Sequence, residues 1–282
     1  MDYARPETLQ DAIALLTAQD WTLLAGGTDV YPATDAQALG CPVLDLTGIA
    51  ALRGIATGHD NWRIGAMTTW SEIAAVELPA AFDGLQAAAR EVGSIQIQNS
   101  ATIGGNLCNA SPAADGVPPL LVLNADVELT SPRGVRQVAL ADFIIGNRQT
   151  ALAGDEIVSA VVIPKNAASG GSAFRKLGAR KYLVISIAMV AVRLDFAYGR
   201  VADAAIAVGA CSAVARRLPD IEAALAGRRI ERLPDAIDPD AVTAALAPID
   251  DIRGPASYRE AAAVTLIRRA IDDVISSGQA AA

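Results

Sequence analysis

The sequence predicts an α+β fold, in which strands and helices alternate first and a small antiparallel sheet with helices comes last. Apolar residues alternate between strand and helical spacing over residues 7–163. Residues 166–171 (N-A-A-S-G-G) are small, polar and glycine-rich, which is typical of a linker. With 282 residues, of which 52% are hydrophobic and 19% charged, the chain is long and apolar enough for more than one compact unit.

Three units are predicted, residues 1–54, 55–165 and 172–282. Thr69 and Glu72 have the spacing of a capping box, so a helix is expected to begin there. Strands are predicted at residues 21–25, 42–46, 53–56, 62–66, 126–131, 137–140, 156–163, 172–177, 186–195 and 201–211. Further helices are predicted at residues 7–18, 79–92, 116–123, 219–226, 240–247 and 258–276.

The composition excludes several classes of partner and compartment. A net charge of −8 argues against nucleic acid or an anionic membrane surface as a partner. No apolar run is long enough to span a membrane, and the first residues lack the pattern of a signal peptide. The cysteines, Cys41, Cys108 and Cys211, are too scattered for a disulfide framework, so a cytoplasmic location is expected.

The most informative segment runs from Thr102 to Asp115 and reads T-I-G-G-N-L-C-N-A-S-P-A-A-D. Adjacent Gly104 and Gly105 remove two side chains where a ligand approaches the backbone, and Asn106 offers an amide. A loop of this length inside a compact domain is usually functional. Asp115 either binds a sugar hydroxyl of the ligand or caps the helix that follows it.

A second glycine pair, Gly26–Gly27, follows a short predicted strand. A turn of this kind presents backbone amides that suit a phosphate, and Thr28 adds a hydroxyl. The alternative is a plain turn between a strand and a helix, with Asp29 as the helix cap. Two neutral, amide-rich segments together favour a site for a phosphate-bearing cofactor.

Several common sites are absent from the sequence. No two glycines are two positions apart and no Gly-Lys-Ser/Thr occurs, so neither the usual dinucleotide fingerprint nor a Walker loop is present. His59 is the single histidine and is interpreted as a surface turn residue, which leaves no basis for a catalytic triad or a histidine-rich metal site. Cys108 is interpreted as a small buried residue rather than a nucleophile.

Two basic pairs follow the linker, Arg175–Lys176 and Arg180–Lys181. In an acidic chain they face either a ligand or partner, or only solvent, and the sequence leaves both interpretations open. The arginines of the last predicted helix are interpreted as ordinary solvated charge: Arg259, Arg268 and Arg269.

Six stretches together form a pattern that covers most of the chain. They are L-A-G-G-T-D (24–29), I-G-A-M-T-T (64–69), Q-N-S-A-T-I-G-G-N (98–106), A-S-P-A-A-D (110–115), D-F-I-I-G (142–146) and F-R-K-L-G (174–178). In this pattern the sequence resembles the FAD-binding (medium) subunit of molybdenum hydroxylases, a family that includes carbon monoxide dehydrogenase and xanthine dehydrogenase.

The resemblance implies a vanillyl-alcohol-oxidase (PCMH)-type FAD-binding domain of two α/β subdomains, followed by the C-terminal α+β domain. It places the FAD pyrophosphate between the two glycine segments and Ile97 near the flavin ring, and leaves open whether Arg175 or Lys176 faces the cofactor. The cofactor-binding residues it implies are Ala25, Gly26, Gly27, Thr28, Asp29, Ile97, Thr102, Ile103, Gly104, Gly105, Asn106, Asp115 and Lys176.

In this family the chain would be an oxidoreductase subunit with no catalytic side chain and no metal of its own. Electrons would come from a molybdenum cofactor on a large subunit through [2Fe–2S] clusters on a small subunit, and FAD would pass them to NAD, oxygen, a quinone or a carrier protein. A dimer of heterotrimers is expected. The alternatives are a stand-alone FAD oxidase or reductase of the same fold superfamily, and a non-catalytic assembly subunit.

Overall fold

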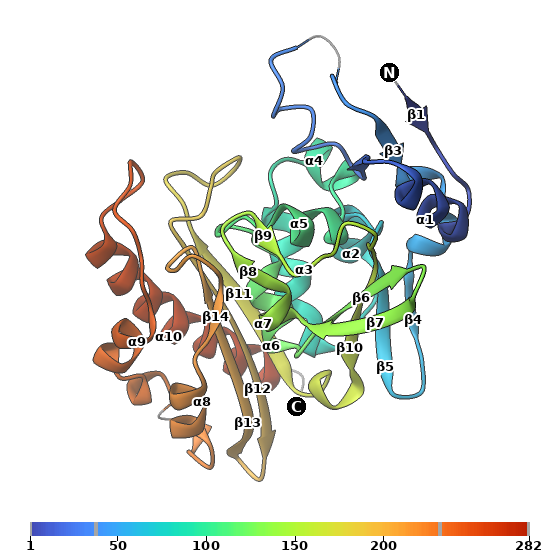
Figure 1. Ribbon diagram of the computed structural model, residues 1–282. Coiled ribbons are helices and arrows are strands. Elements are labelled where there is room, and N and C mark those ends of the chain that lie inside the picture. The colour runs from blue at the N-terminus through green and yellow to red at the C-terminus, as the bar shows by residue number, and fades with distance from the viewer. Residues whose placement is uncertain (1, 37–38, 231–232, 281–282) are drawn as a thin grey trace.

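The computed structural model describes residues 2–36, 39–230 and 233–280, and three larger sheets follow one another along this part of the chain (Figure 1). The three predicted units remain a prediction, and their outer ends, residue 1 and residues 281–282, lie outside the described residues. No described helix is both long and apolar enough to cross a membrane.

The first region holds a parallel sheet of order β1-β3-β2 with one helix beside it. Thr8 begins the helix by accepting a hydrogen bond from the Asp11 backbone N–H. The first glycine segment follows β2 directly, so it lies at the carboxyl edge of this sheet. The elements are β1 (Tyr3–Ala4), α1 (Leu9–Ala18), β2 (Thr22–Leu24) and β3 (Val43–Asp45).

The second region is built on an antiparallel sheet of order β4-β5-β10-β6-β7. Trp70, Phe82 and Phe143 are fully buried in the core beside it. Its strands are β4 (Ile55–Thr57), β5 (Asn61–Gly65), β6 (Asp126–Ser131), β7 (Gly134–Ala139) and β10 (Ile157–Pro164), with a small hairpin of β8 (Ile144–Gly146) and β9 (Gln149–Thr150). Its helices are α2 (Trp70–Ala75), α3 (Asp83–Glu91), α4 (Ile95–Ser100), α5 (Ile103–Asn109), α6 (Val117–Val122) and α7 (Leu140–Phe143).

The segment expected to be a loop at residues 102–115 instead begins with helix α5, and α4 precedes it. The expectation of a loop rested on the weak helix propensity of glycine and asparagine. It was wrong because tertiary contacts override that propensity in this segment. Thr102 caps α5 by accepting a hydrogen bond from the Gly105 backbone N–H at 3.1 Å. The predicted capping box is confirmed, since Thr69 and Glu72 exchange their hydrogen bonds at the start of α2.

The third region is an antiparallel sheet of order β11-β12-β13-β14 that is buried on both faces. Met189 and Ala191 join the core of the second region, while Val190 and Val192 pack toward the C-terminal helices, as the alternation of a strand requires. Those helices cover the outer face of the sheet (Figure 1). The elements are β11 (Gly171–Leu177), β12 (Ala188–Ala197), β13 (Arg200–Gly209), β14 (Arg216–Arg217), α8 (Pro219–Leu225), α9 (Pro239–Ala245) and α10 (Ala256–Ala280).

One arginine of α10 contradicts its sequence-based interpretation. Arg259 was expected to be solvated, yet only 3% of its surface is exposed. Its guanidinium donates hydrogen bonds to the carbonyl oxygens of Ile187 and Ala210 and to the carboxylate of Asp251. The helical pattern did not reveal these partners, because they lie next to the ends of β12 and β13 and in the loop before α10.

Candidate cofactor site

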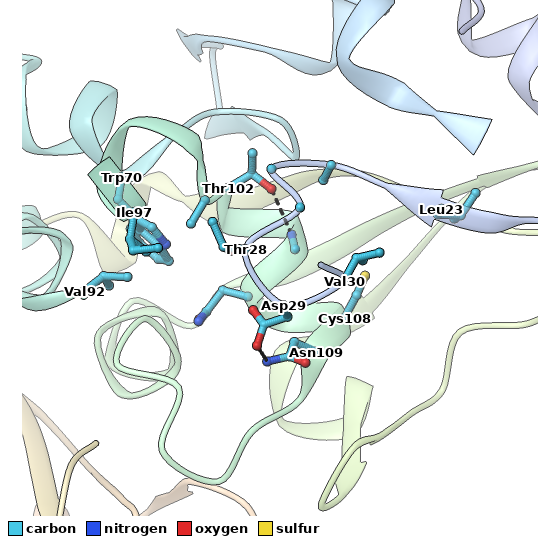
Figure 2. Close-up of a pocket in the computed structure, with 16 residues that line it drawn as sticks. Leu23, Thr28, Asp29, Val30, Trp70, Val92, Ile97, Thr102, Cys108 and Asn109 are labelled. Atoms are coloured by element: carbon cyan, nitrogen blue, oxygen red, sulfur yellow. Dashed lines mark hydrogen bonds between the residues drawn. The ribbon is translucent and has the colours of Figure 1, made fainter. Parts of the chain in front are cut away.

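The two glycine segments face each other across a cavity of about 420 Å³ (Figure 2). This cavity brings together most of the residues that the sequence assigns to a cofactor. Of the predicted set, the lining includes Ala25, Gly26, Gly27, Thr28, Asp29, Ile97, Thr102, Gly105 and Asn106. The predicted residues outside the lining are Ile103, Gly104, Asp115 and Lys176.

The first segment packs directly against the backbone that leads into the second segment. A Cβ atom on Gly26 would lie 1.9 Å from the carbonyl oxygen of Ser100, so no other residue fits there. Gly27 has a φ of +72°, which glycine adopts without strain. The segment continues as a turn rather than a helix, so Asp29 is not a helix cap. Its carboxylate accepts a hydrogen bond of 2.9 Å from the side-chain amide of Asn109 and so links the two segments.

The adjacent glycines of the second segment have different tasks. A Cβ atom on Gly104 would lie 2.7 Å from the Cβ of Ala66, so Gly104 allows α5 to pack on the strand end beneath it. A Cβ atom on Gly105 would meet only the hydroxyl of Thr102, at 3.0 Å, and the Cβ of Ala25, at 3.9 Å. Gly105 therefore keeps open the space between the two segments.

One end of the cavity is apolar and carries an unpaired donor. Figure 2 shows Trp70, Val92 and Ile97 gathered at this end, away from Leu23 and Cys108. The indole N–H of Trp70 is buried and has no hydrogen-bond partner among the described residues, and the same holds for the side-chain oxygen of Asn106. Because buried polar atoms are normally paired, these two atoms indicate that the site is completed by a ligand.

Sequence analysis missed Trp70. The residue opens α2 directly after the Thr69 cap, and a tryptophan at that position has the same pattern as any core residue. Trp70 reaches the site because an isolated β-bridge between Thr69 and Thr102 sets the start of α2 beside the start of α5. The residues around Trp70 do not by themselves indicate this contact between distant segments.

With FAD as the cofactor that the family resemblance implies, Trp70→Phe is expected to weaken its binding about tenfold while leaving the apoprotein as stable as before or slightly more stable. Phenylalanine keeps most of the apolar surface but lacks the N–H, whose burial without a partner costs about 1–3 kcal/mol. FAD titration and denaturant unfolding of the apoprotein measure the two effects separately. Parallel losses of affinity and stability would show that Trp70 acts through packing alone.

The titratable side chains in the lining are those of Asp29 and Cys108. Cys108 was expected to be buried, but it is exposed, because α5 places it in the lining of the cavity. Desolvation by the surrounding protein still raises the pKa of its thiol to about 12, so the thiol stays neutral near pH 7. Asp29 is held by Asn109. His59 lies in an exposed turn next to Asp60, and it is not part of the lining. The lining can bind and shield a ligand, but it offers no poised base or nucleophile.

Asp115 and Lys176 form a buried ion pair beside the cavity, with 2.5 Å between carboxylate oxygen and ammonium nitrogen. The hydroxyl of Ser186 donates to the other carboxylate oxygen at 2.6 Å, and Lys176 also donates to the carbonyl oxygen of Glu91, next to Val92 in the lining. Burial raises the pKa of Asp115 despite the opposing effect of Lys176. Arg175, in contrast, points to the other face of β11 and pairs with Asp273.

Comparison with known proteins identifies the family of the chain that forms this cavity. The family model described as "FAD binding domain in molybdopterin dehydrogenase" matches residues 1–166, and "CO dehydrogenase flavoprotein C-terminal domain" matches residues 172–274. The nicotine 6-hydroxylase medium subunit of Paenarthrobacter nicotinovorans is 35% identical over 95% of both chains. The carbon monoxide dehydrogenase medium chain of Afipia carboxidovorans is 33% identical over 96% of this chain and 95% of its own.

A solved structure extends this likeness to the whole fold. A chain of the reconstituted CO dehydrogenase from Oligotropha carboxidovorans superimposes with a TM-score of 0.88 at 31% identity, covering 98% of each chain. The predicted family resemblance and the predicted fold class are thereby confirmed. The glycine spacing and the unpaired buried atoms fit FAD, and Asp29, the carboxylate in the described lining, is held by Asn109. The chain belongs to the FAD-binding medium subunits of the molybdenum hydroxylases, the oxidoreductase family of CO and xanthine dehydrogenases.

Proposed function

We propose that this chain is the electron relay of a molybdenum hydroxylase, in which bound FAD receives electrons from [2Fe–2S] clusters of a small subunit and delivers them to a terminal acceptor. One observation carries the proposal: two glycine segments enclose a cavity, yet the described residues that line it include no base or nucleophile poised to transform a substrate. FAD supplies the redox chemistry because it accepts single electrons and releases pairs.

The residues of the chain bind and orient the cofactor. The backbone N–H groups of Gly27 and Thr28 would donate to the pyrophosphate. Gly105 would leave room for it, because the N–H of Gly105 itself is used by the Thr102 cap. Val92, Ile97 and Trp70 exclude water from the flavin ring at the apolar end. Asp115 and Lys176 were predicted to contact the cofactor. We propose that they instead support its binding indirectly, by holding the wall of the cavity in place, because the two side chains form an ion pair with each other.

We propose further that the chain works in the cytoplasm as the medium subunit of a heterotrimer, itself paired into a dimer of heterotrimers. The large subunit would hold the molybdenum cofactor, and the small subunit the iron–sulfur clusters. The support is the near full-length match to medium chains from several such dehydrogenases. The substrate of the complex would be set by the large subunit, so this chain does not specify it.

The test is to purify the complex from its native source through a tag on this chain and to mix it anaerobically with candidate substrates. Nicotine, nicotinate, xanthine, caffeine, glyceraldehyde and CO form the panel, because relatives carry these names. We expect molybdenum and iron to copurify, and the flavin absorbance near 450 nm to bleach only in the complex. Bleaching of the isolated FAD-loaded chain by an organic substrate would instead favour a stand-alone oxidase.

A further inference from the structure

The first glycine segment packs against an aromatic ring that is not part of the cavity lining. A Cβ atom on Gly27 would lie 2.4 Å from Cε2 and 2.7 Å from Cδ2 of Tyr31, so the ring fills the space that a side chain at Gly27 would need. Tyr31 is absent from the residues that line the cofactor cavity. The ring therefore contacts the segment without reaching the space for the ligand.

Tyr31 also closes the backbone of the same turn. Its N–H donates a hydrogen bond of 3.1 Å to the carbonyl oxygen of Gly27. Pro32 follows directly, and a proline disfavours helical backbone at the residue before it. The segment consequently remains a turn, and Figure 2 shows Thr28 and Asp29 placed along it at the cavity.

Gly27 is the position in this turn where a constraint on the backbone matters most. Its φ is +72°, and an unconstrained glycine populates positive and negative φ about equally. A change of φ at Gly27 rotates its own N–H relative to the N–H of Thr28, and successive N–H groups must converge to bind an anion. The ring of Tyr31 covers one side of the Gly27 backbone and so restricts this rotation.

Burial in a core does not account for the position of the ring. Tyr31 is 56% exposed, and it is not a member of the apolar cluster formed around the first sheet. An exposed side chain of this kind contributes little to the stability of the fold. Removal of the ring should therefore affect the turn more than the fold.

We propose that Tyr31 is a positioning residue for FAD, whose ring holds Gly27 in the conformation in which the N–H groups of Gly27 and Thr28 face the pyrophosphate. The ring orders the turn before the cofactor binds, and a segment that is ordered in advance binds its ligand more tightly. The inference rests on the proposed function in that FAD is the ligand of the cavity. Tyr31 acts through Gly27 and touches neither the pyrophosphate nor the flavin.

The test measures the affinity of this chain for FAD and the rate at which FAD dissociates, both from flavin fluorescence. Tyr31→Ala is expected to weaken binding about tenfold and to speed dissociation, on the scale of ordering one backbone residue. Tyr31→Phe keeps the ring atoms that meet Gly27, so it should bind FAD like the unchanged protein. Tyr198→Ala is the matched control, because Tyr198 is fully exposed in the turn between β12 and β13.

Unfolding of each apoprotein in denaturant separates positioning from stability, and Tyr31→Ala should leave the midpoint unchanged. The inference is overturned if Tyr31→Ala binds and releases FAD like the unchanged protein, if Tyr31→Phe binds as weakly as Tyr31→Ala, or if the apoprotein loses stability in parallel with affinity. FAD content of the unchanged protein is determined first. Its absence would contradict the proposed function and this inference with it, whereas an FAD-loaded protein that is insensitive to Tyr31→Ala contradicts only the role of Tyr31.

Discussion

Gly105→Val should abolish FAD binding and leave the protein folded. The backbone at Gly105 does not have a positive φ, so valine adopts it without strain, and valine is a better helix former than glycine. Its side chain would project into the space between Thr102 and Ala25, which the two segments keep open. We expect the affinity for FAD to fall at least about 100-fold, because the pyrophosphate needs that space.

The measurement is FAD titration of the apoprotein, followed by unfolding of the apoproteins alone, because bound FAD would itself raise stability. Gly154→Val is the matched control: Gly154 lies in open space on the surface, so its FAD affinity should equal that of the unchanged protein. Gly104→Val provides a contrast, because its clash with Ala66 should destabilise the fold. Full flavin content in Gly105→Val would remove the second segment from the cofactor site.

The sequence predicted that the two glycine segments belong to one site better than it predicted their conformation. The glycine pairs were informative because a missing side chain has few causes, and close approach of backbone or ligand is the main one. The same residues concealed α5, whose stability comes from packing on Ala66 and from the Thr102 cap rather than from helix propensity. Local composition therefore indicated that other parts of the chain approach the segment closely, but it did not indicate the helical conformation of the segment.

Residues whose role depends on distant partners could not be predicted. Arg259 has the pattern of a solvated helix residue, and its burial follows from carbonyl groups that come from the ends of β12 and β13. Trp70 resembles any core aromatic until its N–H is seen to lack a partner. Lys176 and Arg175 are indistinguishable as neighbours in sequence, but the alternation of β11 turns Lys176 inward to Asp115 and Arg175 outward to Asp273.

Breaking the Asp115–Lys176 pair should cause a large loss of stability. Lys176→Met or Asp115→Asn is expected to cost about 3–5 kcal/mol of unfolding free energy, because each leaves a buried charge without its partner. The double variant, with both charges removed, should recover most of that loss. Arg175→Met is the matched control and should cost less than about 1 kcal/mol, because the pair of Arg175 with Asp273 is solvent-exposed.

The loss in Lys176→Met should depend on pH. Burial already raises the pKa of Asp115, and removal of the ammonium raises it further, so the folded protein binds a proton more tightly than the unfolded chain. Stability is then retained below the unfolded pKa and falls as pH rises through the folded pKa. Chemical unfolding at pH 5 and pH 8 should show the larger loss at pH 8; an equal loss would mean that Asp115 is not the stranded charge.

The double variant also separates the two roles that the pair could have toward FAD. If the pair acts through the wall of the cavity, restored stability should bring restored FAD affinity, because Glu91 and Val92 return to their places. If Asp115 or Lys176 contacts the cofactor directly, the double variant should be stable yet bind FAD as weakly as the single variants. We expect the first result, since the carboxylate and the ammonium already use each other, Ser186 and Glu91 as partners.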